Sequence, residues 1–413
     1  MMAAEGPFLA AIIARLPGPE FNLGAYGVAF ALAILIEAPV IMLMSAATSL
    51  VRDRASYLKM RNFSRGLIVG ATLLLLVILS PDVYQWLTKT LLQLPAEVAD
   101  LTYGALWFFL PWPSAIGYRR FLQGVLIRAG KTRLVAIGTL IRIVGMSGAA
   151  LIGYLLLDIP GAWVGGLALG TGVTVEAIAA RFMAAETVQE LLAREGSLDQ
   201  VMTYREIAGF YMPLALTSFI GLTIQPLLTF FMGRSVSPVE SLAVYPVVHS
   251  LSFFFRSMGF AYQDAAIALM GERFEHYQEL RRFCFTLGAA ATAGLALVAF
   301  TPLFHLWFIT LSGLTHELAS FALTPTRIIV PLPFLSVLLS FQRAILVEGR
   351  TTRHITWASV IEVITVAALF ILLGFRFDIV GATAAFSAFL GGRLLSTAYL
   401  APGCTRVLSK HSS

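Results

Sequence analysis

The chain has 413 residues and a formal net charge of +6; 58% of its residues are hydrophobic, 13% are charged, and its mean hydropathy is +0.81. Most apolar runs between charged clusters exceed the roughly 20 residues that a helix needs to cross a hydrocarbon core. The composition therefore excludes a water-soluble globular protein and predicts a polytopic helical membrane protein. Because Lys and Arg are spread over many short loops, the positive charge is typical of membrane topology and does not indicate a nucleic-acid partner.

The apolar runs, taken in chain order, predict a short element at residues 1–16 followed by eleven complete spans. The spans are expected at residues 22–50, 62–88, 100–128, 133–157, 161–190, 205–233, 240–270, 278–308, 316–348, 353–374 and 379–408. A polar link at residues 191–204 divides the chain into an N-terminal membrane bundle, residues 1–190, and a C-terminal membrane bundle, residues 205–413.

The two bundles are related by an internal repeat. Residues 6–133 correspond to residues 225–353 at an offset that stays between 219 and 221, so that Trp86, for example, falls on Trp307. Two repeated apolar bundles are the architecture of secondary transporters, which place their substrate site between the halves. We therefore predict an all-α protein with an N-lobe and a C-lobe of six helices each, in a frame of twelve spans with a truncated first helix.

The first helix is short compared with its own counterpart. The second copy has a segment from about Tyr204 to Phe231, and residues 1–16 correspond only to the end of that segment. Two explanations stay open. Either the native chain starts upstream of Met1, which we favour, or the first span has half the usual length.

Basic residues crowd the predicted loops on one side of the membrane. They are Arg52, Arg54, Lys59, Arg61, Arg65, Arg128, Lys131, Arg133, Arg273, Arg281, Arg282, Arg350, Arg353, Arg406 and Lys410. By the positive-inside rule this side is cytoplasmic. We expect a multi-pass protein of the plasma (inner) membrane with both termini in the cytoplasm.

The architecture resembles a known superfamily of exporters. Two bundles of six spans, each with a proline-broken fourth helix, resemble the multidrug/oligosaccharidyl-lipid/polysaccharide exporter superfamily. Within it, one stretch is similar to the progressive ankylosis protein family, with multidrug and toxin extrusion (MATE) proteins as nearest relatives; it contains Met212-Pro213-Leu214-Ala215-Leu216, Pro226, Glu240-Ser241-Leu242-Ala243, and Tyr245-Pro246-Val247 followed by His249. This resemblance implies export of small organic anions such as citrate, or of phosphate compounds. The short first helix departs from the family pattern and leaves open any site that relatives place there.

Buried ion pairs are predicted from charges that the repeat exchanges. A charge at the bilayer centre costs at least about 2.5 kcal/mol, so each is expected to face a partner or a cavity. Glu37 and Arg142 both fall near mid-membrane, and their counterparts Arg256 and Glu362 carry the opposite signs. Because a double exchange preserves a contact, we predict the pairs Glu37–Arg142 and Arg256–Glu362. They either pin the packing of each bundle, or one pair opens during transport to take a proton or the substrate.

Three further residues are candidates for coupling. Glu176 and Arg393 fall one place apart in the repeat and are expected to extend the two charge networks. His249 titrates in a range that suits proton coupling, although a hydrogen-bonded interior histidine explains it equally.

Four arginines are predicted to bind the substrate, one without an obvious acidic neighbour in sequence and three deeper toward the cytoplasm, where they could line an inward-facing vestibule. They are Arg327, Arg343, Arg119 and Arg120. A guanidinium grips a carboxylate or phosphate through two parallel hydrogen bonds, which favours an anionic substrate. Snorkelling to the inner headgroups is the alternative for all but Arg327. The segment from Ile207 to Met232 contains no Asp or Glu, which disfavours an organic-cation pump.

Prolines in two predicted helices are expected to act as hinges. Pro111, Pro113, Pro331 and Pro333 each remove a backbone donor and clash with the carbonyl four residues earlier, so both helices are predicted to bend. Such breaks are tolerated where they face neighbours or a water-filled cavity, and they permit one bundle to rock on the other. A static fit to curved neighbours explains the same prolines without motion.

Enzyme chemistry has little support in the sequence. The six histidines make no metal-ligand spacing with Cys or carboxylates, and Gly130-Lys131-Thr132 lacks the upstream glycine of a phosphate-binding loop. We expect no catalytic site, no metal and no cofactor.

Three functions remain. Secondary-active export of small organic anions, carboxylates or phosphate compounds, by alternating access of the two bundles is the leading prediction. MATE-type multidrug efflux coupled to protons or sodium, and flipping of a lipid-linked phosphate or saccharide, are the alternatives. The expected partners are an anionic small molecule, membrane lipid, and a proton or sodium ion.

Overall fold

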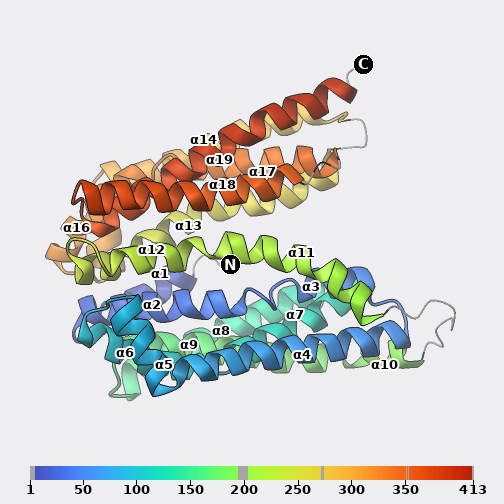
Figure 1. The fold of residues 1–413 in the computed structure, drawn as a ribbon, viewed down its shortest axis with the longest axis horizontal. Helices are drawn as coiled ribbons and strands as arrows, with labels where there is room; N and C mark the ends of the chain where they lie inside the picture. The colour runs from blue at the N-terminus through green and yellow to red at the C-terminus, as the bar shows by residue number, and fades with distance from the viewer. Residues whose placement is uncertain (1–4, 194–202, 271–273, 350, 352, 412–413) are drawn as a thin grey trace. The chain divides into compact units, whose positions relative to one another are not determined.

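The computed structural model describes residues 5–193, 203–270, 274–349, 351 and 353–411, which form helices and short connections without strands (Figure 1). The predicted all-α membrane fold is confirmed. The first half contains α1 (Glu5–Ile13), α2 (Pro19–Glu37), α3 (Leu43–Leu50), α4 (Arg54–Leu79), α5 (Pro81–Gln85), η2 (Trp86–Leu91), α6 (Ala96–Phe108), α7 (Trp112–Arg128), α8 (Thr132–Leu156), α9 (Gly161–Met183) and α10 (Ala185–Ala193). The second half contains α11 (Tyr204–Leu222), α12 (Ile224–Met232), α13 (Pro238–Leu269), α14 (Tyr277–Phe300), α15 (Leu303–His305), η4 (Leu306–Leu311), α16 (His316–Ile328), α17 (Leu332–Glu348), α18 (Arg353–Phe370), η5 (Ile371–Arg376) and α19 (Gly381–His411).

Each predicted span corresponds to one helix or to consecutive helices separated by a short break. Within the described residues, six helices are long and apolar enough to cross a membrane singly, and the bent pair α16 and α17 makes a seventh when taken together. The six are α2, α4, α8, α9, α14, and α18 with its π-helical end η5. Several predicted spans are divided, as between α2 and α3, between α6 and α7, and between α11 and α12.

Contacts along the chain group the helices into two compact units. In the described residues, the first unit is Ala25–Pro226, and the second unit is Ala3–Gly24 with Leu227–Ser413. Part of the predicted link at 191–204, namely residues 194–202, lies outside the described residues. Within the first unit α8 packs along α9, and within the second α18 packs along α19.

Two helices are grouped with the opposite half of the sequence: α1 with the second unit and α11 with the first. α1 belongs to the second unit, where a side chain on Gly6 would meet Ser250 of α13 at 2.8 Å. Arg15, just beyond α1, donates from its guanidinium to the Thr310 carbonyl at 2.6 Å. In the first unit the Tyr211 hydroxyl of α11 donates to the Pro39 carbonyl. The two helices are therefore held by specific contacts to helices made in the other half of the sequence.

Glycines at equivalent places allow close helix contacts in both units. A Cβ on Gly172 of α9 would lie 3.2 Å from the Arg142 carbonyl oxygen of α8. A Cβ on Gly392 of α19 would lie 2.9 Å from the Glu362 carbonyl oxygen of α18. One repeat offset relates both the two glycines and the two charged residues. The repeat is therefore retained in the packing that positions the predicted intramembrane charges.

The predicted hinge prolines lie at the breaks between α6 and α7 and between α16 and α17. Pro111 and Pro331 are the N-cap residues of α7 and α17, and Pro113 and Pro333 lie in the first turn of these helices. Proline is favoured there because its missing N–H is one that a helix start leaves unpaired. The axes of α16 and α17 differ by 41°.

Threonine hydroxyls brace both breaks from the neighbouring helix. The Thr72 hydroxyl of α4 lies 2.9 Å from the Ser114 hydroxyl, and the Thr292 hydroxyl of α14 accepts a hydrogen bond from the Phe334 N–H at 3.1 Å. The two pairs occupy equivalent positions in the repeat. Each break therefore has a polar partner of its own, as an interrupted helix in a membrane requires.

Substitution of Gly172 tests the packing of α8 on α9. Gly172→Ala is expected to destabilise the protein by about 1–3 kcal/mol, because the new methyl group displaces the α8 backbone. The measurement is equilibrium unfolding in mixed detergent micelles. Gly148→Ala is the matched control, since nothing lies within 4 Å of a Cβ at that position. The control should be neutral or slightly stabilising, as replacement of a helical glycine usually is, and equal losses for both variants would contradict the packing argument.

Candidate functional site

Glu176 is the centre of a buried charge network in the first unit. Its side chain is completely buried on α9, and Oε2 accepts a hydrogen bond from Arg119 of α7 at 2.7 Å. The Arg142 Nε of α8 lies 3.6 Å from the same oxygen, and Gln123 Nε2 donates to Oε1 at 3.1 Å. One carboxylate thus holds groups from two neighbouring helices, which compensates the cost of burying it.

Glu37 stands at the end of α2 and completes the first-unit cluster. Its carboxylate accepts a hydrogen bond from the Trp112 indole N–H at 2.8 Å, and its side chain is 7% exposed. It lies within electrostatic reach of Arg120, Arg119 and Arg142. Arg120 also points a guanidinium nitrogen at the Met44 sulfur at 3.7 Å. We call Glu37, Arg119, Arg120, Arg142 and Glu176 the first-unit charge cluster.

The second unit contains a corresponding cluster with fewer acids. The Glu362 carboxylate of α18 forms an ion pair with Arg393 of α19 at 2.8 Å. Arg256 of α13 donates from Nε to the Ser336 hydroxyl at 3.2 Å. The guanidinium carbons of Arg256 and Arg393 lie 4.7 and 5.5 Å from the centre of the Phe389 ring, one cation–π contact each. With Arg343, these three charged residues form the second-unit charge cluster.

The two clusters hold the predicted pairs differently. In the second unit Glu362 forms its ion pair with Arg393. In the first unit Arg142 lies close to Glu176, and Glu37 accepts a hydrogen bond from the Trp112 indole while staying within electrostatic reach of Arg142. A third charged residue, Glu176 in one unit and Arg393 in the other, therefore joins each predicted pair, and the pair Glu37–Arg142 stays a prediction.

Arg256 is the least compensated of these charges. Its side chain is 5% exposed, and its NH1 nitrogen is buried without a hydrogen-bond partner. Among the described residues, no carboxylate lies within salt-bridge distance of it. Arg343 of α17 is similar, because its Nε is buried without a hydrogen-bond partner and its interaction with Glu362 is purely electrostatic.

Both clusters carry excess positive charge. If all groups are ionised, the first-unit cluster has three guanidinium groups and two carboxylates, a net charge of +1. The second-unit cluster has three guanidinium groups and one carboxylate, a net charge of +2. Such groups are costly to bury in a membrane without a counter-charge.

The remaining predicted residues lie elsewhere in the second unit. Arg327 is exposed on α16, where its guanidinium lies 5.5 Å from the Phe300 ring and donates to the Ala299 carbonyl at 3.5 Å. His249 of α13 stacks on the Tyr245 ring at 5.6 Å. Arg327 is thus near the surface and outside the second-unit charge cluster. Among the described residues, no three His, Cys, Asp or Glu side chains are grouped as a metal ion requires.

Solved structures of membrane transporters share this fold. A multidrug resistance MATE family transporter of the MOP superfamily, in an inward-facing conformation, has a TM-score of 0.79 at 14% identity over 99% of this chain and 95% of its own. The lipid II flippase MurJ has a TM-score of 0.71 at 12% identity over 99% and 88%. A MOP superfamily transporter from Pyrococcus furiosus, whose binding pocket is described as reversed in polarity and suggestive of a different function, has a TM-score of 0.67 at 13% identity over 100% and 96%. The sequence matches no protein-family model and no curated protein.

The chain therefore has the fold of a two-lobe, multi-pass membrane transporter. More particularly, it has the fold of the MATE transporters of the MOP superfamily, as the sequence resemblance predicts. Its structural neighbours include transporters and a flippase.

Removal of the Glu176 carboxylate tests whether it holds the first-unit charge cluster together. Glu176→Gln is expected to cost about 3–5 kcal/mol of stability, because Arg119 and Arg142 lose their shared counter-charge in a buried place. Unfolding in detergent micelles measures the loss. Glu186→Gln removes a carboxylate that Lys131 holds at 3.0 Å in an exposed pair and should have a far smaller effect. A similar small effect at Glu176 would mean that the buried arginines are neutralised in another way.

Proposed function

We propose that this protein is a secondary-active exporter of small organic anions, carboxylates or phosphate compounds, which works by alternating access of its two membrane bundles. Its place would be the plasma membrane, with both termini in the cytoplasm. The fold supports the transport mechanism, and the single observation that carries the substrate class is the uncompensated guanidinium of Arg256.

Arg256 carries the argument because its environment is incomplete without an anion. One hydrogen bond to Ser336 and the face of Phe389 satisfy only part of a group with five N–H donors. The free donors form a planar fork, and carboxylate and phosphate oxygens match this fork through two parallel hydrogen bonds. A cation placed beside Arg256 would add repulsion to an already positive cluster.

The other arginines divide into two groups by their partners. Arg119 and Arg393 are held by carboxylates, so we assign them to positioning the clusters. Arg120 and Arg343 lack a carboxylate at salt-bridge distance within the described residues, and we assign them with Arg256 to the substrate. Glu176 and His249 remain candidates for coupling, because a proton added to the carboxylate or the imidazole changes the net charge of its surroundings. Arg393 stays protonated, and it remains a candidate only through its ion pair with Glu362.

Two alternatives follow from the same fold. MATE-type multidrug efflux, coupled to protons or sodium, is supported by the fold but requires an acidic or apolar site for cationic drugs. A flippase for a lipid-linked phosphate or saccharide is supported by the similarity to MurJ, and the phosphate of such a lipid would suit the same arginines. Transport measurements separate the three.

Transport in proteoliposomes tests the substrate class. We expect exchange of citrate, malate or pyrophosphate, and we expect Arg256→Gln to reduce it about 10- to 100-fold, since hydrogen bonds to a charged group contribute roughly 1.5–3 kcal/mol each. Without substrate, the stability of this variant should be unchanged or higher, because a buried uncompensated cation has been removed. Arg376→Gln, in the exposed end of η5, is the matched control and should transport normally.

Two results would overturn the anion proposal. Exchange of cationic dyes without exchange of any anion would indicate multidrug efflux, and movement of a lipid-linked diphosphate alone would indicate a flippase. A strong loss of stability in Arg256→Gln would show that Arg256 pins the packing.

The hinge is tested at the break between α16 and α17. Replacement of Pro331 and Pro333 by alanine restores two backbone donors and should straighten the pair, so the exchange rate is expected to fall several-fold while the protein stays folded. Initial rates and thermal unfolding give the two readouts. Unchanged rates would mean that the 41° bend is a static fit to its neighbours.

A further inference from the structure

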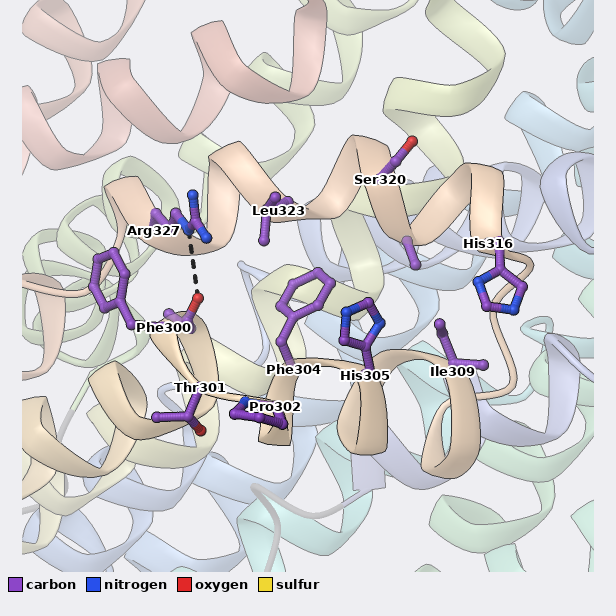
Figure 2. Close-up of a pocket in the computed structure, with 12 residues that line it drawn as sticks. Phe300, Thr301, Pro302, Phe304, His305, Ile309, His316, Ser320, Leu323 and Arg327 are labelled. Atoms are coloured by element: carbon purple, nitrogen blue, oxygen red, sulfur yellow. Dashed lines mark hydrogen bonds between the residues drawn. The ribbon is translucent and has the colours of Figure 1, made fainter.

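A cavity of about 410 Å³ lies in the second unit between α16 and the segment formed by the end of α14, α15 and η4. Figure 2 shows Arg327 at one end of this space and His305 and His316 toward the other, with Leu323 and Phe304 between them. Its size falls in the range of roughly 300–1,000 Å³ that is usual for small-molecule sites. We call it the Arg327 cavity.

The repeat explains why the cavity exists. At an offset of 220, Leu323 occupies the place of Tyr103 and Arg327 occupies the place of Trp107. In the first unit these aromatic rings lie in contact, with centroids 6.3 Å apart, and Tyr103 also packs on Tyr84 at 4.8 Å. The second unit replaces two large rings with a smaller side chain and a flexible cation. The two replacements therefore create the cavity and place a positive charge in its wall.

Backbone carbonyls at equivalent positions of the repeat accept a side-chain hydrogen bond in both units. The Tyr103 hydroxyl donates to the Leu79 carbonyl at 3.1 Å, and Arg327 Nε donates to the equivalent Ala299 carbonyl at 3.5 Å. Arg327 thus donates to this carbonyl where the first unit uses a neutral tyrosine hydroxyl. A charged donor is not needed for this hydrogen bond. Apart from this long bond and the Phe300 ring, no protein partner of Arg327 is found among the described residues.

The walls of the Arg327 cavity combine one cation with apolar surface. Phe304, Ile309 and Leu323 supply the apolar lining, while Ser320 adds a hydroxyl beside them. A site built from apolar walls with a few placed polar groups selects an amphipathic ligand, and the polar groups fix its orientation. The cation sets the charge of the ligand head.

We propose that the Arg327 cavity binds an amphipathic anion, in which one carboxylate or phosphate group is joined to a hydrocarbon body. The anionic head lies on the Arg327 guanidinium, and the hydrocarbon body follows Phe304 and Leu323 toward His305. Exposed apolar side chains extend from the lining outward: Phe300 in the lining is 60% exposed, and Leu306, outside the lining, is 48% exposed. In a membrane protein such a surface faces lipid, so a ligand with a hydrocarbon body reaches the cavity from the bilayer.

This site is separate from the buried charge clusters. Arg327 is exposed, whereas Arg256 and Glu362 are 5% and 3% exposed. The inference therefore does not rest on the proposed transport of small anions, and binding to purified protein measures it directly.

Native mass spectrometry of the full chain, released from phosphatidylcholine nanodiscs, provides the test. The probes are dodecanoate, dodecanol and dodecyltrimethylammonium, which share a chain and differ in the head, together with phosphatidylglycerol as a bilayer lipid with an anionic headgroup. We expect an anionic probe to be retained over the alcohol and the cation. Arg327→Gln should lower its retention roughly tenfold or more, as expected for the loss of charge-assisted hydrogen bonds.

Two further variants use the repeat as a control. Leu323→Tyr places the first-unit side chain in the cavity and should abolish binding while the Arg327 charge is kept. The double variant Tyr103→Leu and Trp107→Arg gives the first unit the second-unit side chains at these two positions. It should create a second binding site, so that the protein retains a second anionic probe molecule. Arg376→Gln removes an exposed arginine away from the cavity and should bind as the wild type does.

The outcomes separate the two sources of the anion. Arg327-dependent retention of dodecanoate supports a free amphiphile, and Arg327-dependent retention of phosphatidylglycerol alone supports a membrane lipid. Equal retention of dodecanol and dodecanoate, or retention of the anionic probes that Arg327→Gln leaves unchanged, overturns the proposal. Thermal unfolding confirms that each variant is folded, and Arg327→Gln is not expected to shift it because the side chain is exposed.

Discussion

The structure depends on how each unit compensates the free-energy cost of burying charged side chains away from water. Each unit contains several guanidinium groups that are buried or half-buried among its helices, and carboxylates are too few to neutralise them in pairs. In the first unit Glu176 is shared between arginines of two helices, which ties α7, α8 and α9 together. In the second unit the single acid Glu362 is taken by Arg393, and Arg256 is left with a hydroxyl and a ring. An interaction that holds one unit together is thus incomplete in the other.

The two units show how a repeat retains geometry while its chemistry diverges. The glycines that allow α9 and α19 to approach their neighbours, the prolines that break the helices before α7 and α17, and the threonines that brace these breaks all recur at equivalent positions. Side chains that do not fix the backbone have changed freely. Glu37 stands where the other unit has Arg256, and Trp107 stands where it has Arg327.

Much of the fold was predictable from sequence, because hydropathy and the repeat report on backbone requirements that the bilayer imposes. The spans and the broken helices follow from them. The partners of the charges were not predictable in the same way. Glu176 was expected only to extend a network, although it is its centre, and the Trp112 indole was not expected as a donor to Glu37. Helix rotation decides which side chains meet, and periodicity in an almost uniformly apolar helix does not record it. The surface position of Arg327 was missed for the same reason.

The exchange of α1 and α11 between the halves has a consequence for biogenesis. α1 is among the first helices to leave the ribosome, yet the helix it packs against, α13, belongs to the second half of the sequence and is synthesised much later. During that interval α1 has to wait in the membrane with the translocon, lipid or a chaperone covering the face that Ser250 later occupies. The second unit therefore closes only when translation is well advanced, and fragments expressed from either half of the gene would each lack a helix that their own unit requires.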